Sequence, residues 1–172
     1  MQAIHDLVRD VPDFPTPGVL FKDITPLLAD ADAFGQCIDA LCAPWIGQSI
    51  GAVCGIESRG FIFGAAMARA LGTGFIAWRK KGRRPPPVIG ADYGLEYGRD
   101  RLEIGRQTLA PGERVIAVDD VLATGGTLEA GRRLVEQLGA NEVGAGVVIE
   151  LGSLGGWSRW TCFAPLHASV RY

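Results

Sequence analysis

RVIAVDDVLATGGTLEA, residues 114–130, joins a strand pattern, a pair of acidic residues and a glycine–threonine loop to the start of a helix pattern. Residues 115–118 form a short apolar run rich in β-branched side chains, which is typical of a buried parallel strand. Asp119 and Asp120 stand where that strand is expected to end. Small and hydroxyl-bearing residues follow at 123–127, before a helical pattern begins. A strand that leads through a glycine–threonine loop into a helix gathers free backbone N–H groups at one point, so the stretch predicts an anion site.

The composition of this loop favours a phosphate group as the anion. Glycines let the backbone close around a phosphate, and threonine hydroxyls supply further donors. No lysine follows the glycines, so the loop is not the one that binds nucleoside triphosphates, and the glycine spacing does not fit a dinucleotide fingerprint. Carboxylates beside a phosphate suit a ligand that also carries hydroxyls, such as a ribose 5-phosphate. For the two aspartates alone, the alternative is an acidic turn between a strand and a helix.

The overall composition is that of a soluble globular protein large enough for a core. The chain has 172 residues, 48% of them hydrophobic and 21% charged. Its net charge of -2 implies no bulk attraction to nucleic acid, so a polyanionic ligand must be held by a local arrangement.

Four cysteines without a CxxC pair are expected to be buried thiols in a reducing compartment, and two histidines are too few for a metal site. No signal peptide is recognisable, and no apolar run reaches the roughly 20 residues of a membrane span, so the expected location is the cytoplasm.

Strand and helix patterns alternate along the chain and predict an α/β fold: a doubly wound, mainly parallel sheet flanked by helices, in one domain over residues 1–172. Residues 2–10 are expected to form a short helix, and three prolines make an ordered loop the better prediction for residues 11–18. Apolar residues at helical spacing predict a helix over residues 30–45 that Asp30 or Asp32 caps. The other predicted elements are strands at 19–25, 50–56, 74–78, 143–151 and 167–170 and a helix at 61–71.

Three predicted strands are followed by polar or glycine-rich segments, at residues 57–60, 79–96 and 119–127. Open α/β sheets bind ligands at the carboxyl ends of their strands, so these segments are expected to form one site. Arg59 suits a phosphate or pyrophosphate, although an ion pair at the start of a helix is an equal alternative. The second segment has five cations in six residues and then three prolines, which fits either a solvated loop or a basic lid over a polyphosphate. The alternating residues 101–106 read as an exposed strand of a hairpin, with Tyr93–Tyr97 as the partner strand.

Taken together, these segments resemble the type I phosphoribosyltransferases over about residues 14–151. VIAVDDVLATGGT is similar to the phosphoribosyl-pyrophosphate motif of that superfamily. FPTPGVLFKDIT, ESRGFIFG, RKKGRRP and YGLEYG followed by LEI resemble the members that act on adenine. The resemblance implies the type I fold, with a small N-terminal hood at about residues 11–27 and a flexible lid at about residues 79–97.

The resemblance also implies a role for individual residues. Asp119 and Asp120 would bind the ribose hydroxyls, and the 5-phosphate would lie in the loop Ala123, Thr124, Gly125, Gly126 and Thr127. The pyrophosphate would meet Ser58 and Arg59, in a loop where members often carry a cis peptide, and the cations Arg79, Lys80 and Arg83. Adenine would lie between the hood residues Leu20, Phe21 and Lys22, which would use backbone groups, and the apolar wall Val121. Glu96, with Tyr97 beside it, and Arg59 would be the catalytic residues.

The implied reaction joins adenine to phosphoribosyl pyrophosphate and gives AMP and pyrophosphate. Mg²⁺ would arrive with the pyrophosphate, no metal would be held by the protein alone, and the implied assembly is a homodimer without membrane or nucleic-acid partners. The sequence departs from the family pattern in two places: Lys22 replaces an arginine, and Arg83-Arg84 replaces Lys-Leu. The alternatives are a regulator that senses phosphoribosyl pyrophosphate, for which too little chain precedes Phe14 to hold a DNA-binding module, and an enzyme for another base such as hypoxanthine or xanthine.

Overall fold

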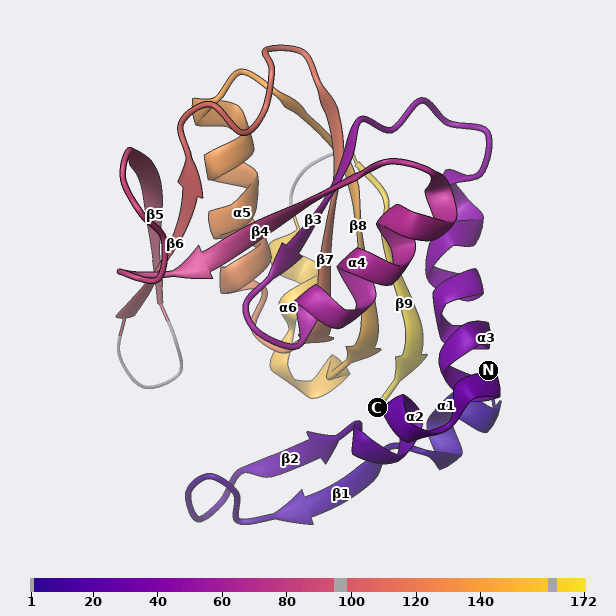
Figure 1. Ribbon diagram of the computed structural model, residues 1–172. Helices are drawn as coiled ribbons and strands as arrows, with labels where there is room; N and C mark the ends of the chain where they lie inside the picture. Colours follow the sequence, from indigo (N-terminus) through magenta and orange to yellow (C-terminus); the bar gives the residue numbers. More distant parts are fainter. Residues whose placement is uncertain (1, 95–98, 161–163) are drawn as a thin grey trace.

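A computed structural model describes residues 2–94, 99–160 and 164–172, and its centre is a seven-stranded sheet in the order β5-β6-β4-β3-β7-β8-β9 (Figure 1). Five of these strands run parallel, and β5 and β6 extend one edge as an antiparallel pair. The strands are β3 (Ala52–Ile56), β4 (Gly74–Lys80), β5 (Val88–Gly94), β6 (Arg99–Gly105), β7 (Arg114–Leu122), β8 (Asn141–Glu150) and β9 (Leu166–Arg171). The predicted α/β class with a mainly parallel sheet is therefore confirmed.

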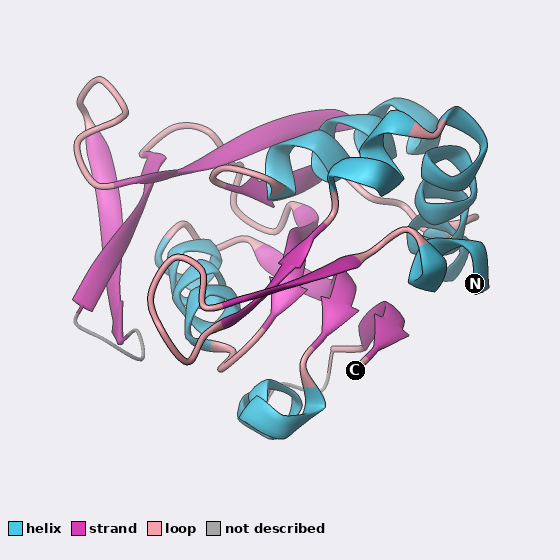
Figure 2. Cartoon of the chain, turned by 90° about the horizontal axis from the view of Figure 1, so that it is seen from below, coloured by secondary structure: helices cyan, strands magenta, loops and turns pink. Residues whose placement is uncertain are grey.

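Helices cover both faces of the sheet (Figure 2). The long helices α3 (Ala31–Cys42) and α4 (Gly60–Leu71) belong to one apolar cluster, and α5 (Gly126–Gln137) belongs to the other. The predicted cap of the first helix is confirmed, because the Asp30 carboxylate accepts a hydrogen bond from the Ala33 N–H at 2.9 Å. The shorter helices are α1 (Gln2–Asp6), α2 (Thr25–Ala29) and α6 (Gly156–Arg159), with single 3₁₀ turns at Ala43–Trp45 and Gly152–Leu154. None of the described helices is both long and apolar enough to cross a membrane.

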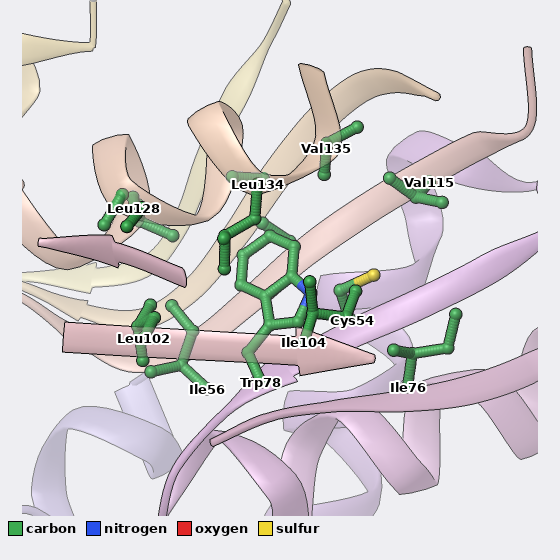
Figure 3. Packing of buried hydrophobic residues seen from close by; sticks show 14 of the residues in the cluster. Cys54, Ile56, Ile76, Trp78, Leu102, Ile104, Val115, Leu128, Leu134 and Val135 are labelled. Atoms are coloured by element: carbon green, nitrogen blue, oxygen red, sulfur yellow. The ribbon is translucent and has the colours of Figure 1, made fainter. Parts of the chain in front are cut away.

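Trp78 of β4 fills the middle of the cluster beneath α5 and is fully buried (Figure 3). Gly131 of α5 lies directly over the indole, since a Cβ built at this position would lie 1.9 Å from a ring carbon. The helix can therefore pack this closely on the sheet only because residue 131 lacks a side chain. This contact fixes the position of α5, whose N-terminus carries the predicted phosphate loop.

The N-terminal segment differs from the prediction. Helix α1 ends at Asp6, and residues 9–12 form a strand, β1 (Arg9–Pro12), that pairs antiparallel with β2 (Leu20–Asp23). The predicted helix over residues 2–10 is therefore too long, and the predicted loop at 11–18 begins too early. The reason is a non-local pairing, since Arg9 forms an ion pair with Asp23 at 2.6 Å across the hairpin. Together β1 and β2 form a separate two-stranded sheet below the main sheet in Figure 1.

Two further boundaries differ from the prediction. Residues 79–96 were expected as one long loop, but β4 continues to Lys80 and β5 starts at Val88, so the connection spans residues 81–87. Strand β6 accordingly pairs with residues 88–94 rather than 93–97. The central strand β7 continues through both aspartates to Leu122, because this part of the strand remains paired with β8.

Candidate active site

The predicted phosphate loop lies at the carboxyl end of β7 and at the start of α5. Gly125 precedes the first residue of the helix and has φ +80°, the left-handed region that favours glycine. A Cβ at Gly125 would also lie 2.8 Å from the carbonyl oxygen of Gly156. The loop Ala123–Thr127 therefore surrounds the N-terminus of a twelve-residue helix, which is the arrangement that an anion site requires.

The two aspartates differ in their surroundings. Asp119 is partly exposed, whereas Asp120 is buried and its Oδ2 lies 2.6 Å from an Nη of Arg59. The two side chains differ in exposure because neighbouring residues of a strand point to opposite faces of the sheet. Burial raises the pKa of both carboxyls, and the charge of Asp120 raises the pKa of Asp119 further, while Arg59 opposes the shift. Two negative charges are thus unfavourable here unless cations lie near them.

Glu57 organises the basic segment, a role that no local sequence pattern predicts. The peptide between Glu57 and Ser58 is cis, as the resemblance implied. The Glu57 carboxylate accepts hydrogen bonds from the backbone N–H of Lys80 at 2.8 Å and from Nε of Arg79 at 3.0 Å, and it lies 3.6 Å from Arg83. Burial alone would raise the pKa of Glu57, but these hydrogen bonds and the two guanidinium charges hold the pKa below its usual value. The loop predicted to bind pyrophosphate and three of the predicted cations are therefore brought together.

The β5–β6 hairpin reaches the phosphate loop from the other side. The Lys80 ammonium binds the Asp100 carboxylate and the Tyr93 hydroxyl, so this cation is held at the hairpin. At the end of β5, the carbonyl oxygen of Gly94 lies 2.9 Å from the position that a Cβ of Gly126 would take. The backbone of β5 thus contacts the first turn of α5 closely. Glu96 and Tyr97, which continue from this point, lie outside the described residues.

A pocket of about 570 Å³ opens between the β1–β2 hairpin and the carboxyl ends of β7 and β8. It brings together all four predicted adenine residues, Leu20, Phe21, Lys22 and Val121. Arg59 and Ala123, which are predicted site residues, also line it, as do Pro17, Gly18 and Val19 of the predicted hood. Leu151, Ser153, Leu154 and Tyr172 complete the wall, and none of these four was a predicted site residue. Leu151 and Tyr172 each follow the carboxyl end of a parallel strand, so the rule that identified the other loops could also have found these two residues.

Arg59 connects this pocket with the acid pair. Besides its ion pair with Asp120, the guanidinium lies 4.9 Å from the centroid of the Phe21 ring and donates to the carbonyl oxygen of Lys22 at 3.3 Å. The Lys22 side chain points elsewhere, since its ammonium lies 2.5 Å from an Asp10 oxygen and 3.7 Å from the centroid of the Tyr172 ring. A ligand in the pocket would therefore meet the backbone of Lys22 rather than its ammonium.

An acid pair and a glycine–threonine phosphate loop at the end of a central parallel strand, beside a basic hairpin, define the site of a phosphoribosyltransferase. In agreement, residues 27–159 match the family model described as phosphoribosyl transferase domain. The adenine phosphoribosyltransferase of Xanthomonas campestris pv. campestris (strain B100) is 50% identical over 165 residues, which are 96% of this chain and 89% of that protein. That of Bradyrhizobium sp. (strain BTAi1) is 51% identical over 170 residues, 98% of this chain and 95% of that protein.

Solved structures agree in fold as well as in sequence. The crystal structure of adenine phosphoribosyltransferase from Rhodothermus marinus has a TM-score of 0.95 at 44% identity and covers 99% of this chain and 97% of its own. The enzyme from Giardia lamblia complexed with 9-deazaadenine has a TM-score of 0.93 at 36% identity, with 98% of this chain and 96% of its own covered. The chain therefore belongs to the phosphoribosyltransferase family, within its adenine phosphoribosyltransferase branch.

Proposed function

We propose that this protein is a purine salvage enzyme that transfers the 5-phosphoribosyl group from phosphoribosyl pyrophosphate to adenine, giving AMP and pyrophosphate. The main support for the proposal is that the predicted phosphate loop and the 570 Å³ pocket share part of their walls. Ala123 belongs both to the phosphate loop and to the 570 Å³ pocket, and Val121 and Arg59 line the same pocket beside the acid pair. A base in the pocket and a phosphoribosyl group at the loop would therefore be neighbours, as glycosyl transfer between them requires.

The residues at the strand ends suit the charges of phosphoribosyl pyrophosphate. Asp119 and Asp120 would accept hydrogen bonds from the ribose hydroxyls, and Ala123–Thr127 would donate to the 5-phosphate. The pyrophosphate would be bound by a set that shares donor groups and positive charge: Ser58, Arg59, Arg79, Lys80 and Arg83. As the bond to pyrophosphate breaks, positive charge develops on the ribose and negative charge on the leaving group. The acid pair and the basic segment then stabilise opposite ends of the separating charge.

Mg²⁺ is the cofactor that this ligand implies. Among the described residues, no three His, Cys, Asp or Glu side chains group into a metal site, and the acid pair supplies hard oxygen donors beside the ribose position. The metal would accordingly take most of its ligands from ribose and pyrophosphate oxygens, with Asp119 and Asp120 nearby. When bound, the ion neutralises charge on the leaving group. The protein's own contribution is to hold the pyrophosphate with cations and to exclude water by means of the hairpin.

Adenine would be recognised by the backbone of the hood. A carbonyl at Leu20–Lys22 can accept from the exocyclic amino group, and an N–H can serve the neighbouring ring nitrogen. Because the Lys22 carbonyl accepts from Arg59 at 3.3 Å, an adenine amino group would share or replace that long bond. Hypoxanthine would set a carbonyl against this carbonyl, and mismatches of this kind can reject an analogue by about 10⁴. Glu96 would move the proton on the imidazole edge of the base.

We further propose a homodimer in the cytoplasm. Ile62 of α4 is 41% exposed and Phe75 of β4 is 36% exposed. The Phe75 ring packs edge-on against the Phe61 ring, with the ring centroids 5.8 Å apart. Exposed apolar side chains of this size support a contact between copies.

The thiols of Cys37, Cys42 and Cys54 are free and buried, which suits a reducing compartment such as the cytoplasm.

A turnover assay with each purine tests the proposed function. The protein should convert adenine and phosphoribosyl pyrophosphate to AMP in the presence of Mg²⁺, lose this activity with a chelator, and regain it when the metal is restored. Comparable turnover of hypoxanthine, guanine or xanthine would overturn the adenine specificity alone. Binding of phosphoribosyl pyrophosphate without turnover of any purine would overturn the enzymatic proposal in favour of a sensor.

A further inference from the structure

The β1–β2 hairpin carries the residues that would face the base, yet it stands apart from the main sheet (Figure 1). A two-stranded hairpin is marginally stable by itself, so its contacts with the rest of the protein decide where its backbone lies. Two such contacts involve Lys22. Its carbonyl accepts from Arg59, and its side chain, only 7% exposed as a residue, reaches in the other direction to Tyr172.

The buried ammonium of Lys22 has two partners of different kinds. Asp10 lies directly opposite in the β1–β2 pairing, and its carboxylate is 2.5 Å away, which neutralises the charge within the hairpin. The face of the Tyr172 ring lies 3.7 Å from the ammonium, and this contact joins the hairpin to the body of the protein. A cation over an aromatic face attracts more strongly when it is removed from water, as Lys22 is here.

The Tyr172 ring is itself held in place. Its backbone N–H donates to the carbonyl of Glu150 at 2.9 Å, and its carbonyl accepts from the N–H of Gly152 at 2.8 Å. The ring stacks on His5 with centroids 4.7 Å apart, and the hydroxyl donates to the His5 carbonyl at 3.1 Å. Tyr172 also lines the 570 Å³ pocket. Its ring is therefore a fixed surface between helix α1, the segment after β8 and the hairpin.

We propose that Tyr172 is a positioning residue for the base: its ring anchors the Lys22 ammonium and thereby holds the backbone of Leu20–Lys22 at the pocket. This inference rests on the proposed function, because the base to be positioned is the adenine of that proposal. The same geometry explains how a lysine can serve at position 22, since its side chain binds the protein and its backbone is left for the ligand. Asp10 supports the arrangement by neutralising the charge that Tyr172 receives.

The test compares Tyr172→Leu, which removes the aromatic face, with Trp157→Leu as the matched control. Trp157 lies outside the pocket and has a guanidinium, that of Arg171, at 5.2 Å from its ring centroid. Tyr172→Leu should raise the KM for adenine about tenfold, while the KM for phosphoribosyl pyrophosphate and kcat stay within about twofold. Tyr172→Phe keeps the ring face and should recover most of the loss, and Trp157→Leu should leave both KM values near those of the parent.

A second measurement needs no turnover. Amide hydrogen exchange of residues 9–12 and 20–23, measured without ligand, should be faster in Tyr172→Leu and Lys22→Met than in the parent, while β3 and β7 exchange as before. The inference would be overturned if the hairpin of Tyr172→Leu exchanged its amide hydrogens at the rate of the parent. It would also be overturned if the KM for adenine and the KM for phosphoribosyl pyrophosphate rose equally. Should the parent fail to use adenine, the proposed function fails, and the exchange measurement still decides whether Tyr172 anchors the hairpin.

Discussion

At the scale of single residues, Arg59 illustrates how much one side chain can connect. Its planar guanidinium meets the Asp120 carboxylate, the Lys22 carbonyl and the Phe21 ring at the same time. A lysine could not reproduce this, because its ammonium is a point charge on a flexible stem. The acid pair and the hood are thus joined by one residue. A ligand that draws the guanidinium toward pyrophosphate would loosen its contacts with both.

Asp119→Asn tests the assignment of the acid pair. The change should weaken binding of phosphoribosyl pyrophosphate, because loss of a hydrogen bond to a charged group costs roughly 1.5–3 kcal/mol. It should also raise the free energy of unfolding at pH 7, since burial and Asp120 raise the pKa of Asp119 and so make its charged form unfavourable. Calorimetric titration and urea unfolding measure the two effects. Asp39→Asn, on the exposed side of α3, is the control, and normal ligand affinity in Asp119→Asn would refute the ribose assignment.

Glu96→Gln tests the proposed proton transfer. The amide keeps the shape of the side chain but cannot exchange a proton, so turnover should fall by about 10² or more. Affinity for phosphoribosyl pyrophosphate should change little. Single-turnover kinetics separate the chemical step from product release. Unaltered turnover, with chemistry shown to be rate-limiting, would reduce Glu96 to a contact of the lid.

At the scale of elements, the packing of α5 on the sheet encloses an unusual carboxyl. Among the described residues, both oxygens of Glu142 in β8 are buried without a hydrogen-bond partner. Burial raises the pKa of Glu142 from 4.5 to about 8, with Glu129 and Glu136 of α5 adding to the shift and Arg132 opposing it. The pKa of the Cys54 thiol is raised as well, mainly by burial and in addition by the Glu142 carboxylate. The carboxyl is therefore largely protonated near neutral pH.

Glu142→Gln should alter how stability depends on pH. The unfolded chain releases this proton near pH 4.5, whereas the folded chain keeps it to about pH 8, so the folded state binds more protons within that window. The free energy of unfolding of the parent therefore falls as pH rises through the window, by at most about 1.4 kcal/mol per unit from this group. Glutamine does not titrate, so it removes this pH-dependent loss of stability and should make the variant the more stable protein at pH 8. Urea unfolding at pH 5, 6.5 and 8 measures the free energy of unfolding of both proteins. Asp39→Asn, at an exposed position of α3, is the control, and parallel curves for parent and Glu142→Gln would contradict the prediction.

At the scale of the whole molecule, the exposed apolar side chains at Ile62 and Phe75 mark the surface proposed for the dimer. Ile62→Glu should convert the protein to a monomer, because a carboxylate at the contact would lose its water without gaining a partner. Sedimentation velocity measures the change. Ile46 is 73% exposed, and Ile46→Glu is the matched control that should leave the dimer intact. A monomeric parent, or a dimeric Ile62→Glu, would refute this surface as the interface.

Features that depend on neighbouring residues could be predicted before the structure was known. The buried run at 115–118, the acid pair and the glycine–threonine loop all lie within one strand–loop–helix unit, so local pattern was enough to predict that unit. The cap at Asp30 was predictable for the same reason, since the capping bond spans three residues. The alternation of strands and helices then left few topologies, because parallel crossovers are right-handed.

Contacts between residues far apart in the chain could not be predicted in this way. Strand β1 exists because it pairs with β2, and the Arg101 side chain of β6 lies across Gly90 of β5, with its Nε 2.3 Å from where a Cβ would be. Tyr172 and Lys22 are 150 positions apart by their numbers and come together at the base pocket. Periodicity shows which side of an element is buried but not what it is buried against. Non-local contacts depend on how the whole chain packs, and no stretch of sequence carries that information alone.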